Sequence, residues 1–185
     1  MPTTAKGLPY PASTAAPNVP ADLQALAQAV DAQLYVPRYK RKNTAENVTN
    51  SIVMQDDDEL LLSLPVGNWR VEAFLNPSGP AAADVNIAWA FTGVLGVTHR
   101  ACIGPATGMT SAGAVTSMRT TVHGITTQVS YGLDGTAASA IHEDLLLVVA
   151  TAGTLKLQWA QNAANATPTV MAAGSTIYAT PMAAG

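Results

Sequence analysis

The chain has 185 residues, which is enough for one domain of ordinary size and a tail but too few for a second enzyme-sized domain. Its formal net charge is −3, so no long-range positive field attracts nucleic acid, and no apolar run reaches the roughly 18 residues of a membrane-spanning helix. Only 11% of the residues are charged, whereas a soluble monomer keeps roughly a quarter of its surface charged. We therefore expect other protein chains, and neither nucleic acid nor a membrane, to cover part of this surface.

Residues 1–19 form a proline-rich segment with small polar residues between the prolines. Proline fixes its own backbone angle and removes a hydrogen-bond donor, so this composition predicts an extended, polyproline-like backbone that becomes ordered against a partner. The candidate attachment residues are Leu8, Pro9, Tyr10 and Pro11, with the tyrosine ring as the anchor. A disordered tail is the alternative interpretation.

Residues 20–36 are predicted to form one amphipathic helix that ends before Pro37. Pro20 suits the first helical position and Asp22 suits the first turn. The apolar stripe consists of Leu23, Leu26, Ala27, Val30 and Leu34. A lone helix of about 15 residues is marginally stable in water, so the stripe must be buried against the chain's own domain or against copies of itself. We expect the second, since the helix stands between a tail and a β domain, and we predict that these five residues mediate oligomerisation.

Four of the nine basic residues stand together at Arg38, Lys40, Arg41 and Lys42. We interpret residues 37–43 as a solvated basic neck after the helix, where cations are favoured, with an anion-binding patch as the alternative. An acidic run follows from Asp56 to Glu59. It is expected either to pair with the neck across subunits or to form a turn.

From residue 44 the apolar period changes to two, which indicates β-strands with one buried side. Val85, Ile87, Trp89 and Phe91 show it most clearly. The expected strands are 47–54, 60–64, 71–75, 85–91, 115–122, 128–132, 141–150, 154–160, 169–171 and 175–180, with turn residues between them. Residues 93–114 are expected to be a long surface loop. The pattern predicts a mainly β fold, an antiparallel β-sandwich of the jelly-roll type over residues 44–185.

The residues that could support catalysis or bind a metal do not form a recognisable pattern in the sequence. His99, His123 and His142 are scattered without the spacing of metal ligands, and Cys102 is expected to be a small buried apolar residue. No nucleophile elbow or phosphate-binding glycine loop is present. The sequence therefore predicts no catalytic residue, metal site or cofactor, and the chain is not expected to be an enzyme. A pair of carboxylates brought together by folding, as in a glycosidase, is the alternative.

The three tryptophans could stack on sugar rings if they were exposed. However, Trp69 is in phase with Val71, and Trp89 and Trp159 are in phase with the apolar residues of their own segments. We therefore expect all three to lie in the core.

A resemblance to known proteins adds to this interpretation. The sequence TTAKGLPYP at residues 3–11, followed by PNVPADLQALA at residues 17–27, resembles the N-terminus of minor tail and fibre-like virion proteins of phages that infect actinobacteria. The sequence AGTLKLQWAQN at residues 152–162, together with residues 167–178, is similar to the last strands of the β domains in these proteins. The two matches cover both ends of the chain.

The resemblance implies a virion structural protein that is made in the host cytoplasm. Its N-terminal segment would bind other virion proteins, and its β domain, as a homotrimer, would be displayed for attachment to the host surface, where a glycan is a candidate partner. The chain lacks a long shaft, so a capsid decoration or head-fibre protein is the alternative. A carbohydrate-binding module or depolymerase is a further alternative.

Overall fold

The computed structural model describes residues 19–33, 37–108, 118–135 and 137–182. The chain divides into two compact units, Met1–Val36 and Pro37–Gly185, which are considered one at a time. The predicted attachment residues Leu8, Pro9, Tyr10 and Pro11 lie outside the described residues.

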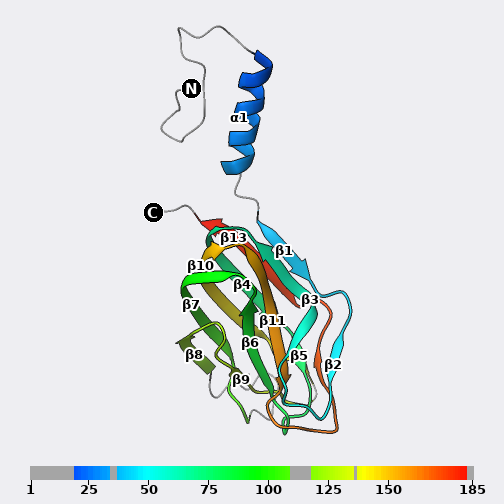
Figure 1. The fold of residues 1–185 in the computed structure, drawn as a ribbon. Coiled ribbons are helices and arrows are strands. Elements are labelled where there is room, and N and C mark those ends of the chain that lie inside the picture. The colour runs from blue at the N-terminus through cyan, green and yellow to red at the C-terminus, as the bar shows by residue number, and fades with distance from the viewer. Residues whose placement is uncertain (1–18, 34–36, 109–117, 136, 183–185) are drawn as a thin grey trace. The chain divides into compact units, whose positions relative to one another are not determined.

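The described part of the first unit is a single helix, α1 (Val19–Gln33) (Figure 1). It begins one residue before the predicted start, and Asp22 lies in its first turn as expected. The predicted residues 34–36 lie outside the described part of the chain. Within that part, no helix has the length and apolar character needed to cross a membrane.

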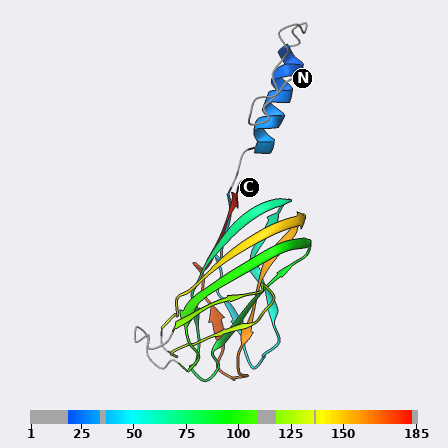
Figure 2. The same cartoon turned by 90° about the vertical axis from the view of Figure 1, so that its left-hand side faces the viewer.

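The second unit consists of antiparallel sheets (Figures 1 and 2). The six-stranded sheet has the spatial order β1 (Arg38–Arg41), β13 (Thr176–Met182), β4 (Gly67–Leu75), β10 (Ile141–Thr151), β7 (Val94–Pro105) and β8 (Met118–His123). The four-stranded sheet has the order β3 (Gln55–Leu64), β11 (Gly153–Gln161), β6 (Val85–Phe91) and β9 (Val129–Tyr131). A small third sheet has the order β2 (Glu46–Val48), β12 (Thr169–Met171) and β5 (Pro77–Ser78). The predicted β-sandwich is confirmed, and its jelly-roll detail stays a prediction.

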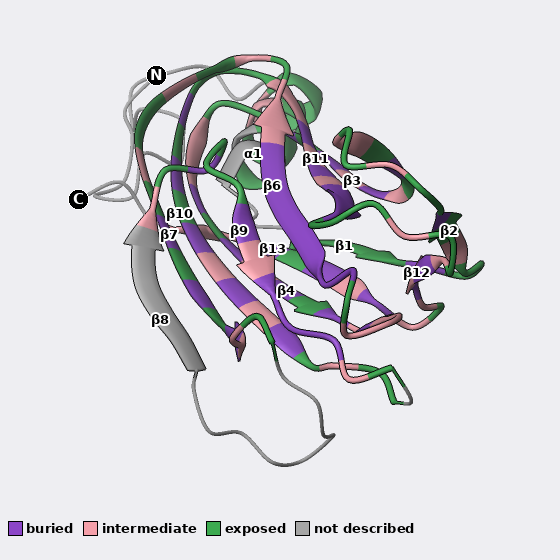
Figure 3. Cartoon of the chain, turned by 90° about the horizontal axis from the view of Figure 1, so that it is seen from below, coloured by how far each residue is buried: buried purple, intermediate pink, exposed green. Residues whose placement is uncertain are grey.

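The core lies between the two larger sheets and follows the two-residue period of the strands. In Figure 3, buried and exposed stretches alternate along several strands. On β4, for example, Trp69, Val71, Ala73 and Leu75 are buried. Trp89 and Trp159 are fully buried as well, and so is Cys102, which confirms the predicted core positions of the three tryptophans and the cysteine.

The prediction of a long loop at residues 93–114 is wrong for Val94–Pro105, which form β7 between β10 and β8, and its residues 109–114 lie outside the described part of the chain. The small residues that suggested a loop instead allow close packing inside the sandwich. A Cβ atom at Gly104 would lie 2.7 Å from Cδ1 of the buried Tyr131 ring, so only glycine leaves room for that ring. The strand predicted at residues 47–54 is also too long. It ends at Val48, shortly before Asn50, whose backbone is left-handed with φ of 53°.

The basic residues 37–43 are not a neck outside the domain, because Arg38–Arg41 form β1 and pair with β13. The β unit therefore begins at Pro37 rather than at residue 44. The acidic run is not a turn either, since it lies in β3. Its Asp57 carboxylate is 2.9 Å from Nζ of the buried Lys42. The ion pair that was expected across subunits is thus made within one chain.

Lys42 connects three parts of the sandwich, because its ammonium group also lies 2.8 Å from Oε2 of Glu46 in β2. Burial alone would lower the pKa of Lys42, but the hydrogen bonds and charges of Glu46 and Asp57 outweigh burial and raise it above its ordinary value. The lysine stays charged, and two carboxylates compensate its burial.

Glu59 provides a prediction about the pH dependence of folding. Its carboxylate accepts hydrogen bonds from the backbone N–H groups of Asn43 and Thr44 at 2.8 and 2.9 Å, and these bonds hold its pKa below the ordinary value. A carboxylate with a lowered folded-state pKa stabilises the fold above its unfolded pKa, and that contribution disappears as the pH falls through the folded-state pKa. Glu59→Gln should therefore be less stable than wild type at pH 7, and the difference should shrink as the pH falls below the unfolded-state pKa of about 4.3. Urea unfolding at pH 7 and at a series of lower pH values measures it, and a difference that does not shrink on acidification would contradict the expectation.

Candidate functional site

The predicted oligomerisation residues lie on α1. Within the chain itself Leu23, Leu26, Ala27 and Val30 are all exposed, with 60% of Leu23 and 40% of Val30 accessible to solvent. Leu34 lies outside the described residues. An exposed apolar stripe on a helix of 15 residues is a candidate contact surface.

A second apolar surface lies on the solvent-facing side of the six-stranded sheet, which we call the outer face. Its large exposed apolar residues are Tyr39, Phe74, Val97, Ile103, Leu146, Val148 and Tyr178, which come from β1, β4, β7, β10 and β13. Strand pairing places them in neighbouring rows: Tyr39 is opposite Tyr178, and Phe74 is flanked by Thr176 and His142. The sequence analysis did not predict this surface.

Charged groups occupy the middle of the outer face. Arg70 lies 2.7 Å from Oδ2 of Asp144 and 3.3 Å from Oε1 of Glu72, and these hydrogen bonds and charges raise the pKa of the arginine. Together with His99 and Leu146, Arg70 and Asp144 line a shallow hollow of about 490 Å³. Two carboxylates share one guanidinium group here, so the centre of the face has a net negative charge.

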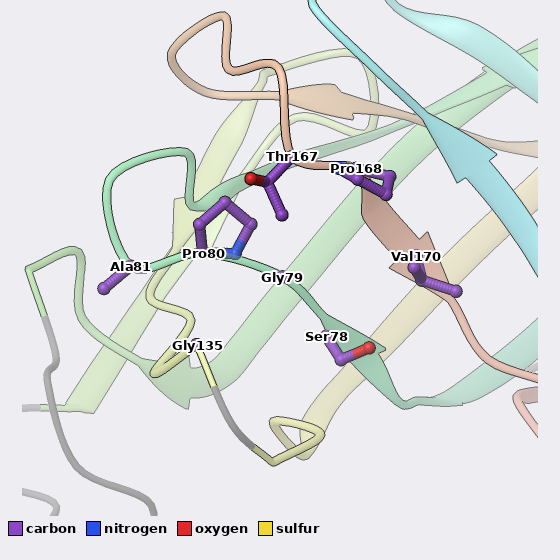
Figure 4. Close-up of a pocket in the computed structure, with 8 residues that line it drawn as sticks. All are labelled: Ser78, Gly79, Pro80, Ala81, Gly135, Thr167, Pro168 and Val170. Carbon is purple, nitrogen blue, oxygen red and sulfur yellow. The ribbon is translucent and has the colours of Figure 1, made fainter.

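A second hollow, of about 380 Å³, lies among the loops at the end of the sandwich opposite Pro37 (Figures 1 and 4). It is lined by Ser78, Gly79, Pro80, Ala81, Gly135, Thr167, Pro168 and Val170. These residues come from β5 and β12 and from the loops between β5 and β6, β9 and β10, and β11 and β12. The lining offers hydroxyl and backbone groups to a neutral polar ligand, and none of its eight side chains is an acid or a base.

The interior holds a network of polar groups that the sequence analysis missed. Arg100 of β7 and Glu143 of β10 are fully buried and paired at 2.6 Å. The five N–H donors of the guanidinium face the two Glu143 oxygens and the backbone carbonyls of Ile87, Ile125 and Thr127. Burial alone would lower the pKa of Arg100, but the charge and hydrogen bonds of Glu143 raise it.

Glu143 in turn accepts hydrogen bonds from both sheets. Nε1 of Trp89 donates to it at 2.6 Å and the hydroxyl of Tyr131 donates at 2.7 Å. Burial, followed by the neighbouring Glu143 charge, raises the pKa of Tyr131, so its hydroxyl stays a donor. All these groups are sealed in the core. The network joins the six-stranded sheet to the four-stranded sheet, and it is a structural element rather than a binding site.

The two fully buried tryptophans give a matched test of this network. Trp89 donates to Glu143, whereas Nε1 of Trp159 has no acceptor among the described residues. Replacing either by phenylalanine removes a similar volume, but Trp89→Phe also removes a hydrogen bond to a charged group, worth about 1.5–3 kcal/mol. Trp89→Phe should therefore lower the free energy of unfolding more than Trp159→Phe does, as measured by urea unfolding followed by circular dichroism. Equal losses would mean that the indole hydrogen bond contributes nothing.

The histidines lie apart from one another, as their spacing suggested. His99 is exposed on the outer face, His142 lies opposite Phe74, and His123 ends β8. Across the described ranges, no three His, Cys, Asp or Glu side chains are grouped so that they could hold a metal ion.

No family model, curated protein or solved structure matches this chain. Its function is therefore inferred from its own residues.

Proposed function

We propose that the chain is a structural protein of a bacteriophage particle, of the minor tail or fibre type, without catalytic activity. In this proposal residues 1–19 bind other virion proteins, α1 associates with copies of itself, and the β-sandwich is displayed as a homotrimer for attachment to the host surface. The resemblance of residues 3–11 and 17–27 to phage tail proteins suggests this class.

The observation that carries the proposal is the exposed apolar stripe of α1. Leu23, Leu26 and Val30 are accessible to solvent within the single chain, and exposure of such a stripe is unfavourable at roughly 25 cal/mol for each Å² of apolar surface. Copies of the helix around a common axis would bury the same stripe on each of them. A homo-oligomer is therefore the simplest arrangement that stabilises the helix.

The shape of the β unit supports display. The start of β1 lies at one end of the sheets, and β5 and the loops after it, which line the hollow, lie toward the opposite end (Figure 1). A domain held through Pro37 would present that loop end outward. The hydroxyl and backbone groups of the hollow suit a neutral polar ligand such as a host glycan.

Particle labelling tests the proposal. Gold-labelled antibody against the purified chain is applied to particles of the phage that encodes it, and bound label is located by electron microscopy. Label at the tail supports the proposed function. Label on the head would replace it with the decoration alternative, and intact particles without the chain would overturn both.

An adsorption assay tests attachment separately. An excess of the purified chain, added to host cells before infection, should slow phage adsorption, because it occupies the same host sites. An equal amount of heat-denatured chain is the control. Unchanged adsorption together with label at the tail would limit the protein to a structural part of the tail.

A further inference from the structure

The outer face is unusually apolar for a solvent-facing sheet surface. About half of Phe74 is exposed, as are 44% of Ile103 and 42% of Leu146, and these residues lie on three adjacent strands. An antiparallel sheet with one solvated face normally alternates apolar and polar residues. Here β10 carries the apolar residues Leu146 and Val148 on the side that faces away from the core. Packing of the core therefore does not explain why these two residues are apolar.

We infer that the outer face binds a second copy of this chain. The outer face would be the surface through which the β domains of the proposed homo-oligomer pack. Only the existence of the oligomer is taken from the proposed function. This interface does not depend on α1 or on where the protein lies in the particle.

The size of the outer face fits this occupant. Six strands at a spacing of about 4.8 Å, with on average about eight residues each at about 3.4 Å per residue, cover roughly 25 Å by 27 Å. That footprint of roughly 700 Å² is comparable to the ~800 Å² that each partner buries in a stable interface of standard size. A small ligand would cover only a fraction of it.

The charges of the face also suit a copy of the same chain. Its centre has two carboxylates, Glu72 and Asp144, for one guanidinium group. On the edge strand β1, Arg41 pairs with Thr176 and therefore lies on the outer face; it is exposed and forms no ion pair with any residue that the structure describes. The basic edge of one copy therefore complements the acidic centre of the next. Such a contact joins two different parts of the face, and it closes into a ring where the rotation between successive copies permits it.

The test compares self-association of full-length variants by sedimentation velocity over about 1 to 100 µM. The face variant is Phe74→Glu with Leu146→Glu, and Ile103→Lys is an independent second variant. Val53→Glu is the matched control, because Val53 is 73% exposed and lies outside the strands. Thermal unfolding of each variant verifies that it is folded. A helix variant, Leu23→Gln with Val30→Gln, is measured beside them.

Burying an unpaired charge in an interface is unfavourable, so both face variants should weaken self-association at least about tenfold, while Val53→Glu stays within about twofold of wild type. Added to the helix variant, the face substitutions should weaken association further. The inference is overturned if the face variants associate as tightly as Val53→Glu, or if wild type remains monomeric. If the wild type is monomeric but antibody against it labels the particle, the proposed interface is wrong and the proposed function is not. If the monomer binds host oligosaccharide through Phe74, the outer face is a glycan-binding surface instead.

Discussion

Arg100→Met should lower the free energy of unfolding by about 3–5 kcal/mol, because it leaves the Glu143 carboxylate buried without its counter-charge. Both side chains are fully inaccessible to solvent, and the guanidinium pairs with both oxygens of Glu143. The substitution also removes the hydrogen bonds of the guanidinium to three backbone carbonyls, of which that of Ile125 keeps the N–H of Trp89 as a donor. Urea unfolding followed by circular dichroism measures the loss.

The outer face provides a matched control. Arg70 also pairs with a carboxylate of β10, Asp144, but its side chain is 47% exposed. Water compensates the loss of an exposed pair, so Arg70→Met should have a much smaller effect. The double variant Arg100→Met/Glu143→Leu should recover part of the stability, since it removes the uncompensated charge. Equal losses for Arg100→Met and Arg70→Met would show that the buried pair does not hold the sheets together.

Gly93→Ala should be the most damaging substitution of a glycine, with a loss of about 3 kcal/mol or more. Gly93 lies in the link between β6 and β7, and this link runs close to the turn that joins β10 to Gly153, the first residue of β11. A Cβ at Gly93 would collide with the carbonyl oxygen of Thr151 and would lie 2.8 Å from that of Ala152. These obstacles are backbone atoms, so the clash is relieved only by moving strands.

Gly124→Ala is the control for this prediction. A Cβ there would meet only the Thr127 hydroxyl, at an ordinary contact distance of 3.5 Å, and the residue is exposed. Its stability should stay within about 0.5 kcal/mol of wild type. Thermal unfolding of both variants tests this prediction. Equal melting temperatures for Gly93→Ala and Gly124→Ala would show that the strands near Gly93 can move apart without loss of stability.

The sequence predicted the fold class and most strands because one buried face produces a two-residue period. This holds for β4, β10 and β11, whose buried residues alternate with others along most of each strand. It failed for β7, where small residues next to the Tyr131 ring removed the apolar signal. It also failed for β3, because Asp57 faces the buried Lys42 rather than solvent. A buried charged residue interrupts the apolar two-residue period, so the strand cannot be recognised from the sequence unless the partner of the charge is known.

The binding surfaces were predicted unevenly. The stripe of α1 could be identified because helical spacing is visible in a single segment. The outer face combines residues from five strands, and no local pattern brings Tyr39, Phe74 and Ile103 together.

The sequence contained one signal of the buried ion pair. Glu143 has the same two-residue phase as the apolar residues Ile141 and Leu145, in a segment predicted to be a strand with one buried side. A charge in that position indicates a buried counter-charge, although it does not say that Arg100 supplies it.

The pairing of the first and last strands has a mechanical consequence. β1 leaves Pro37 and runs antiparallel to β13, with Lys42 fixed at its far end by two carboxylates. A pull between Pro37 and the loops at the opposite end of the sandwich acts along β1. Because the hydrogen bonds of an antiparallel pair are perpendicular to the strands, such a force loads them together in shear instead of opening them one after another. The β unit is thus built to resist tension from the end through which it joins the rest of the chain.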